Sequence, residues 1–158
     1  MKGSGKDENK RAPMYWNKDG NAEGMCKGPA DMDDFRMKFD SLEEQQEDPD
    51  SIYNYVKQVI RVRNQNPVIA RGTTSYLEQY SGEQCFALTR SYEGSNLLLL
   101  GNTSAEAVSV DLTGLTVGGT TAEELVLLGE LYTGEEIAER AGTVVTLPAY
   151  SILILGEE

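Results

Sequence analysis

The stretch Asp48–Gly72, DPDSIYNYVKQVIRVRNQNPVIARG, carries the clearest helix signal in the chain and separates a polar segment from a region of strands. Asp48 is predicted to cap this helix, with Pro49 at its first position. The helix is predicted to end at Asn66, because a residue that precedes proline is driven out of the α region. Apolar side chains recur at helical spacing and predict one stripe: Ile52, Tyr55, Val56, Val59 and Ile60.

The residues after this helix are predicted to form short strands. Apolar runs recur between turn residues such as Ser81-Gly82-Glu83 and Glu93-Gly94-Ser95. The predicted strands span 74–80, 85–92, 96–102, 107–111, 125–128, 144–147 and 151–155. Many short strands with almost no helix signal are typical of an antiparallel β-sandwich with Greek-key connections. The predicted fold class is therefore mainly β: a sandwich preceded by an amphipathic helix and an irregular N-terminal segment.

The core of the predicted sandwich is assigned from the apolar positions of these runs. There are enough of them for a stable small domain. The predicted core side chains are Leu77, Phe86, Leu88, Leu97, Leu99, Val108, Val110, Leu112, Leu125, Leu127, Val145, Leu147, Ile152 and Ile154.

Residues 1–47 have a different composition from the rest of the chain. They contain no valine or isoleucine, and Leu42 is their only leucine. Such a segment cannot bury enough apolar surface to offset the entropy lost on ordering, so we expect a loop with one or two helical turns. Ser41 and Glu44 have the spacing of a capping box and predict a short helix that begins there.

The net charge of −12 is concentrated in the strand region, where residues 73–158 carry 2 basic and 13 acidic side chains, net −11. An acidic surface repels phosphate backbones, so we expect no nucleic-acid partner. No stretch approaches the roughly 20 consecutive apolar residues that a membrane span needs, so we expect no span either.

No metal or cofactor is expected in this chain. It has no histidine, and Cys26 and Cys85 lack the spacing of metal ligands. The acidic cluster that begins at Asp31 does not fit a calcium-binding EF-hand, because Arg36 and Leu42 stand where that loop needs glycine and glutamate. We interpret the cluster as a solvated acidic turn. Two cysteines alone do not determine whether Cys26 and Cys85 stay reduced.

Two motifs resemble the α-amylase family (glycoside hydrolase family 13). The segment GSGKDENKRAPMYWN at residues 3–17 resembles the stretch after the eighth barrel strand, although Ala12 replaces the usual threonine. The end of the 48–72 stretch resembles the end of the last barrel helix. The patterns at residues 86–104 and 147–155 resemble strands of the family's C-terminal domain. The motif residues that match are Arg11, Pro13, Met14, Trp16, Asn17, Arg61, Arg63, Asn64, Pro67 and Gly72.

This resemblance implies that the chain is a C-terminal fragment of such an enzyme. Residues 1–47 would be the loop after the last barrel strand, residues 48–72 the last barrel helix and linker, and residues 73–158 the C-terminal β-sandwich. The parent would be a retaining α-glucan hydrolase of the α-amylase or α-glucosidase type, with its two catalytic carboxylates upstream of Met1. We therefore expect no catalytic residue in this chain, no activity from the chain alone, and a structural role for the sandwich. By the same resemblance a secreted or cell-surface location is favoured, and calcium in the parent stays an open question.

The resemblance also places Asp7, Arg11 and Trp16 near the substrate cleft, because the loops after barrel strands build the active site. An arginine suits hydrogen bonds to sugar hydroxyls, and a tryptophan suits stacking on a sugar ring. The other interpretation is that Arg11 and Trp16 brace the loop against the barrel. The α-glucan substrate would be bound chiefly through the parent's barrel.

An alternative from another functional class is an independent carbohydrate-binding or adhesion module. Its sugar platform would come from tyrosines of the strand region, for which packing is the competing interpretation. These tyrosines are Tyr76, Tyr80, Tyr92, Tyr132 and Tyr150. Such a module does not need residues 1–47 or the helix, so we favour the fragment. The triplet Asn102-Thr103-Ser104 matches a glycosylation sequon, a pattern that arises often by chance.

The predicted apolar stripe has no cover when the barrel is absent. In the parent it is expected to pack on the barrel. Arg63 falls in the middle of the stripe, and a buried arginine is costly unless a carboxylate pairs with it, so an acid of the barrel or the domain junction is expected there. In the isolated chain the face of Ile52, Tyr55, Val56, Val59 and Ile60 is a candidate surface for self-association.

Overall fold

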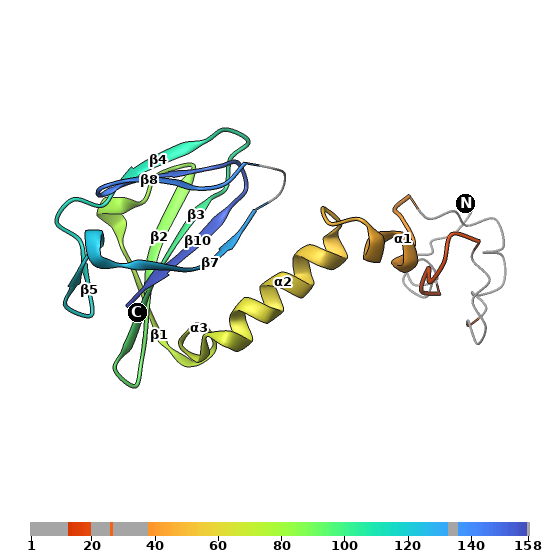
Figure 1. Ribbon diagram of the computed structural model, residues 1–158, viewed down its shortest axis with the longest axis horizontal. Coiled ribbons are helices and arrows are strands. Elements are labelled where there is room, and N and C mark those ends of the chain that lie inside the picture. The colour runs from red at the N-terminus through yellow and green to blue at the C-terminus, as the bar shows by residue number, and fades with distance from the viewer. Residues whose placement is uncertain (1–12, 20–25, 27–37, 133–135, 158) are drawn as a thin grey trace, which may run out of the picture. The chain divides into compact units, whose positions relative to one another are not determined.

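The computed structural model describes residues 13–19, 26, 38–132 and 136–157 (Figure 1). The chain divides into two compact units, Met1–Asn54 and Tyr55–Glu158. The predicted division by role, at 47/48 and 72/73, stays a prediction. Among the described residues, no helix is both long and apolar enough to cross a membrane.

The first unit contains helix α1, Leu42–Glu47, which begins with the predicted capping box. The backbone N–H of Ser41 donates to Glu44 Oε2 at 3.0 Å, and the Glu44 N–H donates to Ser41 Oγ at 3.4 Å. The next two N–H groups of the helix start donate to backbone carbonyls of an earlier segment: Leu42 to Tyr15 at 2.8 Å and Glu43 to Trp16 at 3.0 Å. These bonds supply partners for donors that a helix start leaves unpaired.

Helix α2, Ile52–Gln65, begins three residues later than predicted. Asp48 does not cap it, because this residue is already the C-cap of α1 and its Oδ1 accepts the N–H of Asp50 at 3.0 Å. Instead, Ser51 Oγ accepts the N–H of Asn54 at 3.2 Å, which is the bond that an N-cap side chain makes.

The predicted end of the long helix is confirmed, since α2 stops at Gln65. A short helix, α3, spans Pro67–Arg71, with proline at its start, where the missing N–H costs nothing. Gly72 ends α3 and donates its N–H to Val68 O at 2.9 Å. A Cβ on Gly72 would lie 2.5 Å from that same oxygen, so the chain leaves α3 through a space that only glycine fits.

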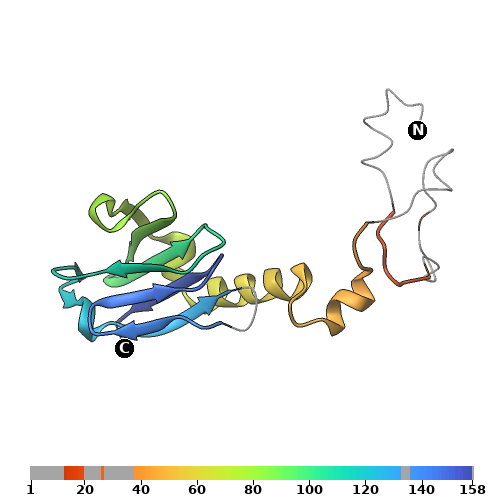
Figure 2. The ribbon, with the colours of Figure 1, turned by 90° about the horizontal axis from the view of Figure 1, so that it is seen from above.

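The second unit contains the predicted antiparallel β-sandwich (Figures 1 and 2). The five-stranded sheet has the order β1-β2-β3-β10-β7, and the three-stranded sheet has the order β4-β9-β8. Strands β5 and β6 form a separate two-stranded ribbon. The strand bounds are Thr73–Tyr76 (β1), Cys85–Tyr92 (β2), Ser95–Asn102 (β3), Val108–Asp111 (β4), Thr116–Val117 (β5), Thr120–Thr121 (β6), Val126–Leu131 (β7), Glu139–Ala141 (β8), Val144–Leu147 (β9) and Ile152–Gly156 (β10).

The strand predictions hold where an apolar run is bounded by turns. β2 and β9 have the predicted bounds, and the β2–β3 hairpin turns at Glu93 and Gly94, which have φ values of 50° and 86° as a type I′ turn requires. The first predicted strand is too long, because after Tyr76 the chain forms a 3-10 turn, Glu78–Tyr80, that buries Tyr80. β5, β6 and β8 were not predicted, since they are two or three residues long and mostly polar.

The described residues form two apolar clusters, one on each face of the five-stranded sheet. Between the sheets lie Leu98, Leu100, Leu153 and Leu155, at most 4% exposed. The second cluster joins Leu97 and Ile154 of the same strands to Val62 and Val68 of the helices. Strands β3 and β10 are therefore buried on both faces, and a strand buried on both faces is a continuous apolar run.

The core prediction was correct in part. It missed Leu98, Leu100, Leu153 and Leu155, because it took only alternate positions of these two runs. It was wrong for Leu127, which is 54% exposed on the edge strand β7.

The predicted apolar stripe of α2 divides into two sides. Tyr55, Val59 and Val62 pack against the sandwich, and Val62 approaches the sheet where Gly129 has no side chain. In contrast, Val56 and Ile60 are 46% and 52% exposed. The helix thus presents a second apolar side, of Val56 and Ile60, that is about half exposed.

Candidate functional site

Two of the three predicted substrate-binding residues, Asp7 and Arg11, lie outside the described residues. Trp16 is described: it is 46% exposed, and its carbonyl accepts the N–H of Glu43. The phenol of Tyr15 donates to Lys18 O at 2.7 Å and closes the turn beside it. The tryptophan ring therefore sits on a turn that is tied through its backbone to the start of α1, with nearly half of its surface accessible.

The acidic cluster at residues 31–34 also lies outside the described residues. In the described part of the chain, no group of three Cys, Asp or Glu side chains is arranged to hold a metal ion. Cys26 is exposed and Cys85 is partly buried, and both are free thiols.

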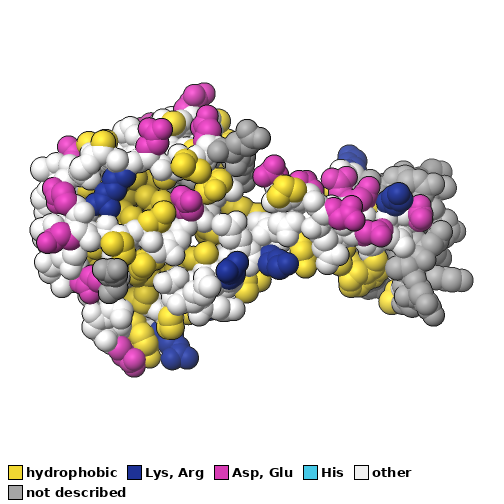
Figure 3. Space-filling model, in the orientation of Figure 1, with side chains coloured by type: hydrophobic (Ala, Val, Ile, Leu, Met, Phe, Trp, Pro, Cys, Tyr) yellow, Lys and Arg dark blue, Asp and Glu magenta, His cyan; other side chains and the backbone are white. Residues whose placement is uncertain are grey.

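Among the described residues, the carboxylates with shifted pKa values all shift in the direction opposite to that of a catalytic acid. The pKa values of Glu44, Asp111 and Glu124 are lowered, in each case first by the hydroxyl and then by the backbone N–H of a nearby serine or threonine. A glycosidase acid needs a raised pKa. Each of these three carboxylates accepts hydrogen bonds from a residue two or three positions away, so we assign all three to local structure. Other acidic side chains are scattered over the visible face of the sandwich (Figure 3).

The tyrosines of the strand region have different surroundings. Tyr80 is 9% exposed and donates its hydroxyl to Thr113 O at 3.2 Å from within the core. Tyr92 packs against the helix-side cluster, with Arg71 6.0 Å from its ring centre. Tyr76 and Tyr150 remain exposed. Packing therefore accounts for Tyr80 and Tyr92 among these five tyrosines.

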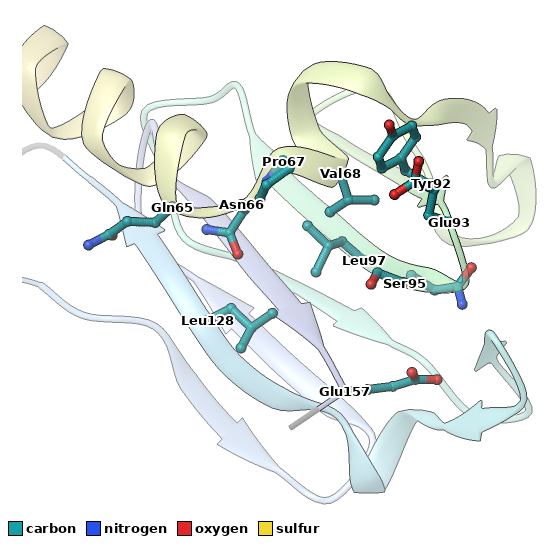
Figure 4. A pocket seen from close by; sticks show the side chains of 11 residues that line it. Gln65, Asn66, Pro67, Val68, Tyr92, Glu93, Ser95, Leu97, Leu128 and Glu157 are labelled. Carbon is teal, nitrogen blue, oxygen red and sulfur yellow. The ribbon is translucent and has the colours of Figure 1, made fainter.

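A pocket of about 410 Å³ opens in the second unit, and sequence analysis did not predict it (Figure 4). Four segments contribute to it: the α2–α3 junction with Asn66 and Val68, the β2–β3 hairpin with Leu97, strand β7 with Leu128, and the C-terminal end of the described chain with Glu157. Each segment has a local structural explanation, so no local pattern marks these residues as members of one site.

The floor of this pocket is apolar. Val68 and Leu97 are 5% and 4% exposed, and Leu128 borders them in Figure 4. A Cβ on Gly156 would lie 2.6 Å from a methyl carbon of Leu97 and of Leu128. Because Gly156 has no side chain, the side chains of Leu97 and Leu128 can both occupy the space next to it beneath the pocket.

The rim of the pocket is polar and held in place by hydrogen bonds. Asn66 Nδ2 donates to Val62 O at 2.8 Å, which turns its Oδ1 toward the pocket in Figure 4. Glu157 Oε1 accepts a bond from the Thr120 hydroxyl at 2.9 Å. The Asn96 amide accepts from Ser91 Oγ at 2.7 Å. The rim groups are thus oriented before any ligand arrives.

No family model matches the chain. Among solved structures, the chain is similar to Eubacterium rectale Amy13B, with 38% identity and a TM-score of 0.85; the match covers 96% of this chain and 28% of that protein. It also shares its fold with an α-amylase from H. orenii, at 23% identity and a TM-score of 0.67, over 91% of this chain and 28% of that one.

The chain belongs to the α-amylase family. It corresponds to the family's C-terminal part, including the β-sandwich domain. The same fold occurs in the F164L mutant of the trehalulose synthase MutB, at 24% identity and a TM-score of 0.66, covering 94% of this chain. This α-amylase family chain spans 26–28% of the length of these three proteins.

Proposed function

We propose that this chain is the C-terminal part of a retaining α-glucan hydrolase of the α-amylase or α-glucosidase type. Its sandwich has a structural role, and residues 1–47 form a loop that lines the substrate cleft. The two catalytic carboxylates belong to the rest of the parent. The proposal is supported by the family membership and by the small share of the neighbours' length that the chain spans.

The observation that carries the proposal is the two-sided apolar surface of α2. Tyr55, Val59 and Val62 pack against the sandwich, while Val56 and Ile60 remain half exposed. An apolar side chain that becomes fully buried contributes about 1.5–3 kcal/mol. A helix with one covered and one uncovered apolar side is the expected junction between this sandwich and a barrel. The uncovered side would then pack on the barrel of the parent.

Arg63 fits the same junction. It is exposed and has no ion-pair partner among the described residues. A barrel that packs on Val56 and Ile60 would also partly bury this guanidinium, which then requires a carboxylate partner. We place that carboxylate in the parent's barrel or at the domain junction.

Trp16 supports a role of the N-terminal segment in the cleft. Trp16 is 46% exposed, so part of its side chain is accessible to a ligand. In the proposed parent this ring stacks on a sugar, while Asp7 and Arg11 bind sugar hydroxyls. The alternative to sugar contact is that Arg11 and Trp16 brace the loop against the barrel.

Expression of the complete parent gene tests the proposal. The parent is expected to release reducing ends from starch and maltooligosaccharides, and the first product should have the α configuration by proton NMR, because retaining enzymes act by two displacements. Sucrose is the comparison substrate. Turnover of sucrose alone, or a first product of β configuration, would contradict the assignment.

The isolated chain provides the matched negative control. It is expected to release no reducing sugar from starch, maltooligosaccharides or an aryl α-glucoside. Release above the buffer level that disappears when a single carboxylate of this chain is replaced would refute the inactivity of the fragment. A parent gene without a barrel-coding region would instead support an independent module.

A further inference from the structure

We propose that the pocket between the α2–α3 junction, the β2–β3 hairpin, β7 and the C-terminal end binds a neutral, hydroxyl-rich sugar ring. Within that class, a glucose unit of an α-glucan is the expected ligand. The choice of glucose rests on the proposed function, whereas the ligand class rests on the pocket itself.

The size and floor of the pocket fit one sugar ring. Small-molecule sites enclose about 300–1,000 Å³ and combine an apolar lining with a few polar groups. This pocket has about 410 Å³, and its floor is made by Val68, Leu97 and Leu128. A pyranose ring has a face of C–H groups that such a floor covers, while its hydroxyls project toward the rim.

The rim offers a ligand both hydrogen-bond acceptors and hydrogen-bond donors. Asn66 uses its amide nitrogen on Val62 O, which leaves Oδ1 as an acceptor that points into the pocket (Figure 4). The carboxylate of Glu157 holds Thr120 through one oxygen and keeps a second oxygen as an acceptor. The Ser95 hydroxyl lies at the same rim. Sugar hydroxyls match this mixed rim, because each hydroxyl donates one hydrogen bond and also accepts from amide N–H groups.

The charge of the lining excludes acidic ligands. Its described residues include Glu93 and Glu157 but no lysine or arginine. A phosphate, nucleotide or uronic acid would therefore meet only like charge. A compact cation is also a poor fit, because Figure 4 shows Glu93 beside Tyr92, on the other side of the pocket from Glu157. A cation would thus contact one carboxylate at a time.

The rim is preorganised by the β5–β6 turn. A Cβ on Gly118 would lie 2.3 Å from Asn96 Nδ2 and 2.9 Å from Glu157 Oε1, so this turn packs directly against both side chains. Asn96 is also fixed by its bond from Ser91 Oγ at 2.7 Å. Groups that are held before binding cost less entropy when the ligand arrives.

The test is an amide-detected NMR titration of the 158-residue chain. Maltotriose, lactose and spermidine are the three probes. Maltotriose is expected to shift the signals of Asn66, Ser95 and Glu157 saturably, with a dissociation constant in the millimolar range. Shifts at these residues with lactose alone would retain the sugar class and remove the glucan assignment. Binding of spermidine alone, or shifts that avoid these residues, would overturn the proposal.

Filling the pocket provides the decisive variant. Leu128→Trp places a large ring over the floor, and Leu127→Trp is the matched control on the adjacent residue of β7, which does not line the pocket. We expect maltotriose to bind Leu128→Trp at least about tenfold more weakly, and Leu127→Trp to bind it as the original chain does. Equal binding by both folded variants would refute the site.

A second variant decides the case if Leu128→Trp does not fold. Glu157→Gln keeps the shape of an exposed side chain but replaces one acceptor oxygen by a donor. Its affinity is expected to fall about threefold to tenfold, because bonds to charged acceptors are the stronger ones. The control is Glu123→Gln, an exposed carboxylate outside the pocket. An unchanged affinity in Glu157→Gln would then overturn the proposal.

Discussion

Asn102 links three segments of the sandwich through one side chain. It is 3% exposed, and its Nδ2 donates to the carbonyls of Glu106 at 2.7 Å, Pro148 at 2.9 Å and Leu147 at 3.3 Å. Its Oδ1 accepts from the N–H of Ser104 at 2.9 Å. The amide that a glycan would modify is therefore occupied and buried, so the sequon at this position is a structural asparagine.

Asn102→Asp should strongly destabilise the sandwich. The change places an oxygen in contact with three carbonyl oxygens and leaves them without a donor. We expect a loss of about 2–4 kcal/mol in the free energy of unfolding, measured by urea denaturation at neutral pH. The control is Asn64→Asp, an exposed position in α2. A loss below about 0.5 kcal/mol for Asn102→Asp would show that the network contributes little.

Asp111 makes stability depend on pH in a defined direction. The hydroxyl of Thr113, followed by its N–H and the hydroxyl of Thr143, lowers the pKa of this carboxylate below its ordinary value of 3.8. A carboxylate whose pKa is lowered in the folded state stabilises the fold. This contribution is fully present above the pKa of the unfolded state and is lost as the pH falls through the pKa of the folded state. The contribution of Asp111 should therefore be constant at neutral pH and disappear in acid.

Asp111→Asn removes the titration while retaining an oxygen that accepts from Thr113. The stability difference between the original chain and the variant should be constant above about pH 5 and shrink as the pH falls below about 3.8. Urea denaturation across this range gives the measurement. Thr113→Ala removes the largest cause of the shift and should weaken the pH dependence. A stability difference that does not vary with pH would disprove the assignment.

At the scale of elements, α2 combines a packed side with an uncovered side. Gln58 Nε2 donates to Glu130 O on strand β7 at 3.0 Å, and Val62 fills the space above Gly129. These contacts fix which apolar residues face the sandwich. Val56 and Ile60 remain on the other side, at i and i+4, where neighbouring helix side chains form one surface.

We expect the isolated chain to self-associate through this uncovered side. Burial of each apolar side chain contributes about 1.5–3 kcal/mol, so Ile60→Lys should shift the chain toward the 17.4 kDa monomer in light scattering. Thr116→Lys adds the same charge at an exposed position of β5 and should not. A chain that is monomeric at high concentration, with residues 1–60 resistant to protease, would show that the side is covered from within.

At the scale of the whole molecule, the proposed parent gives Arg11 a role that the isolated chain cannot display. Arg11→Ala in the full-length parent should lower kcat/KM more than it lowers the melting temperature. The loss of hydrogen bonds to a sugar corresponds to about 1–3 kcal/mol in the transition-state free energy. An unchanged kcat/KM with a lower melting temperature would assign Arg11 to bracing of the loop.

Sequence alone determined the elements whose stabilising contacts are local. The capping box of Ser41 and Glu44, the turn at Glu93 and Gly94, and the end of α2 before Pro67 each depend on residues within four positions of one another. The alternation and turn spacing of the later strands likewise predicted the antiparallel sandwich. Such signals survive in a single sequence because the responsible atoms are neighbours along the chain.

The tertiary structure decided which apolar surfaces meet. The run Leu97–Leu100 is buried on both faces because the second sheet covers one side and the helices cover the other, and no periodicity reveals both partners. Leu127 is exposed because β7 lies at a sheet edge. The pocket that joins Asn66 to Glu157 exists only after four separate segments converge. These features depend on long-range packing, in which the partner of a side chain is set by topology and not by its neighbours in sequence.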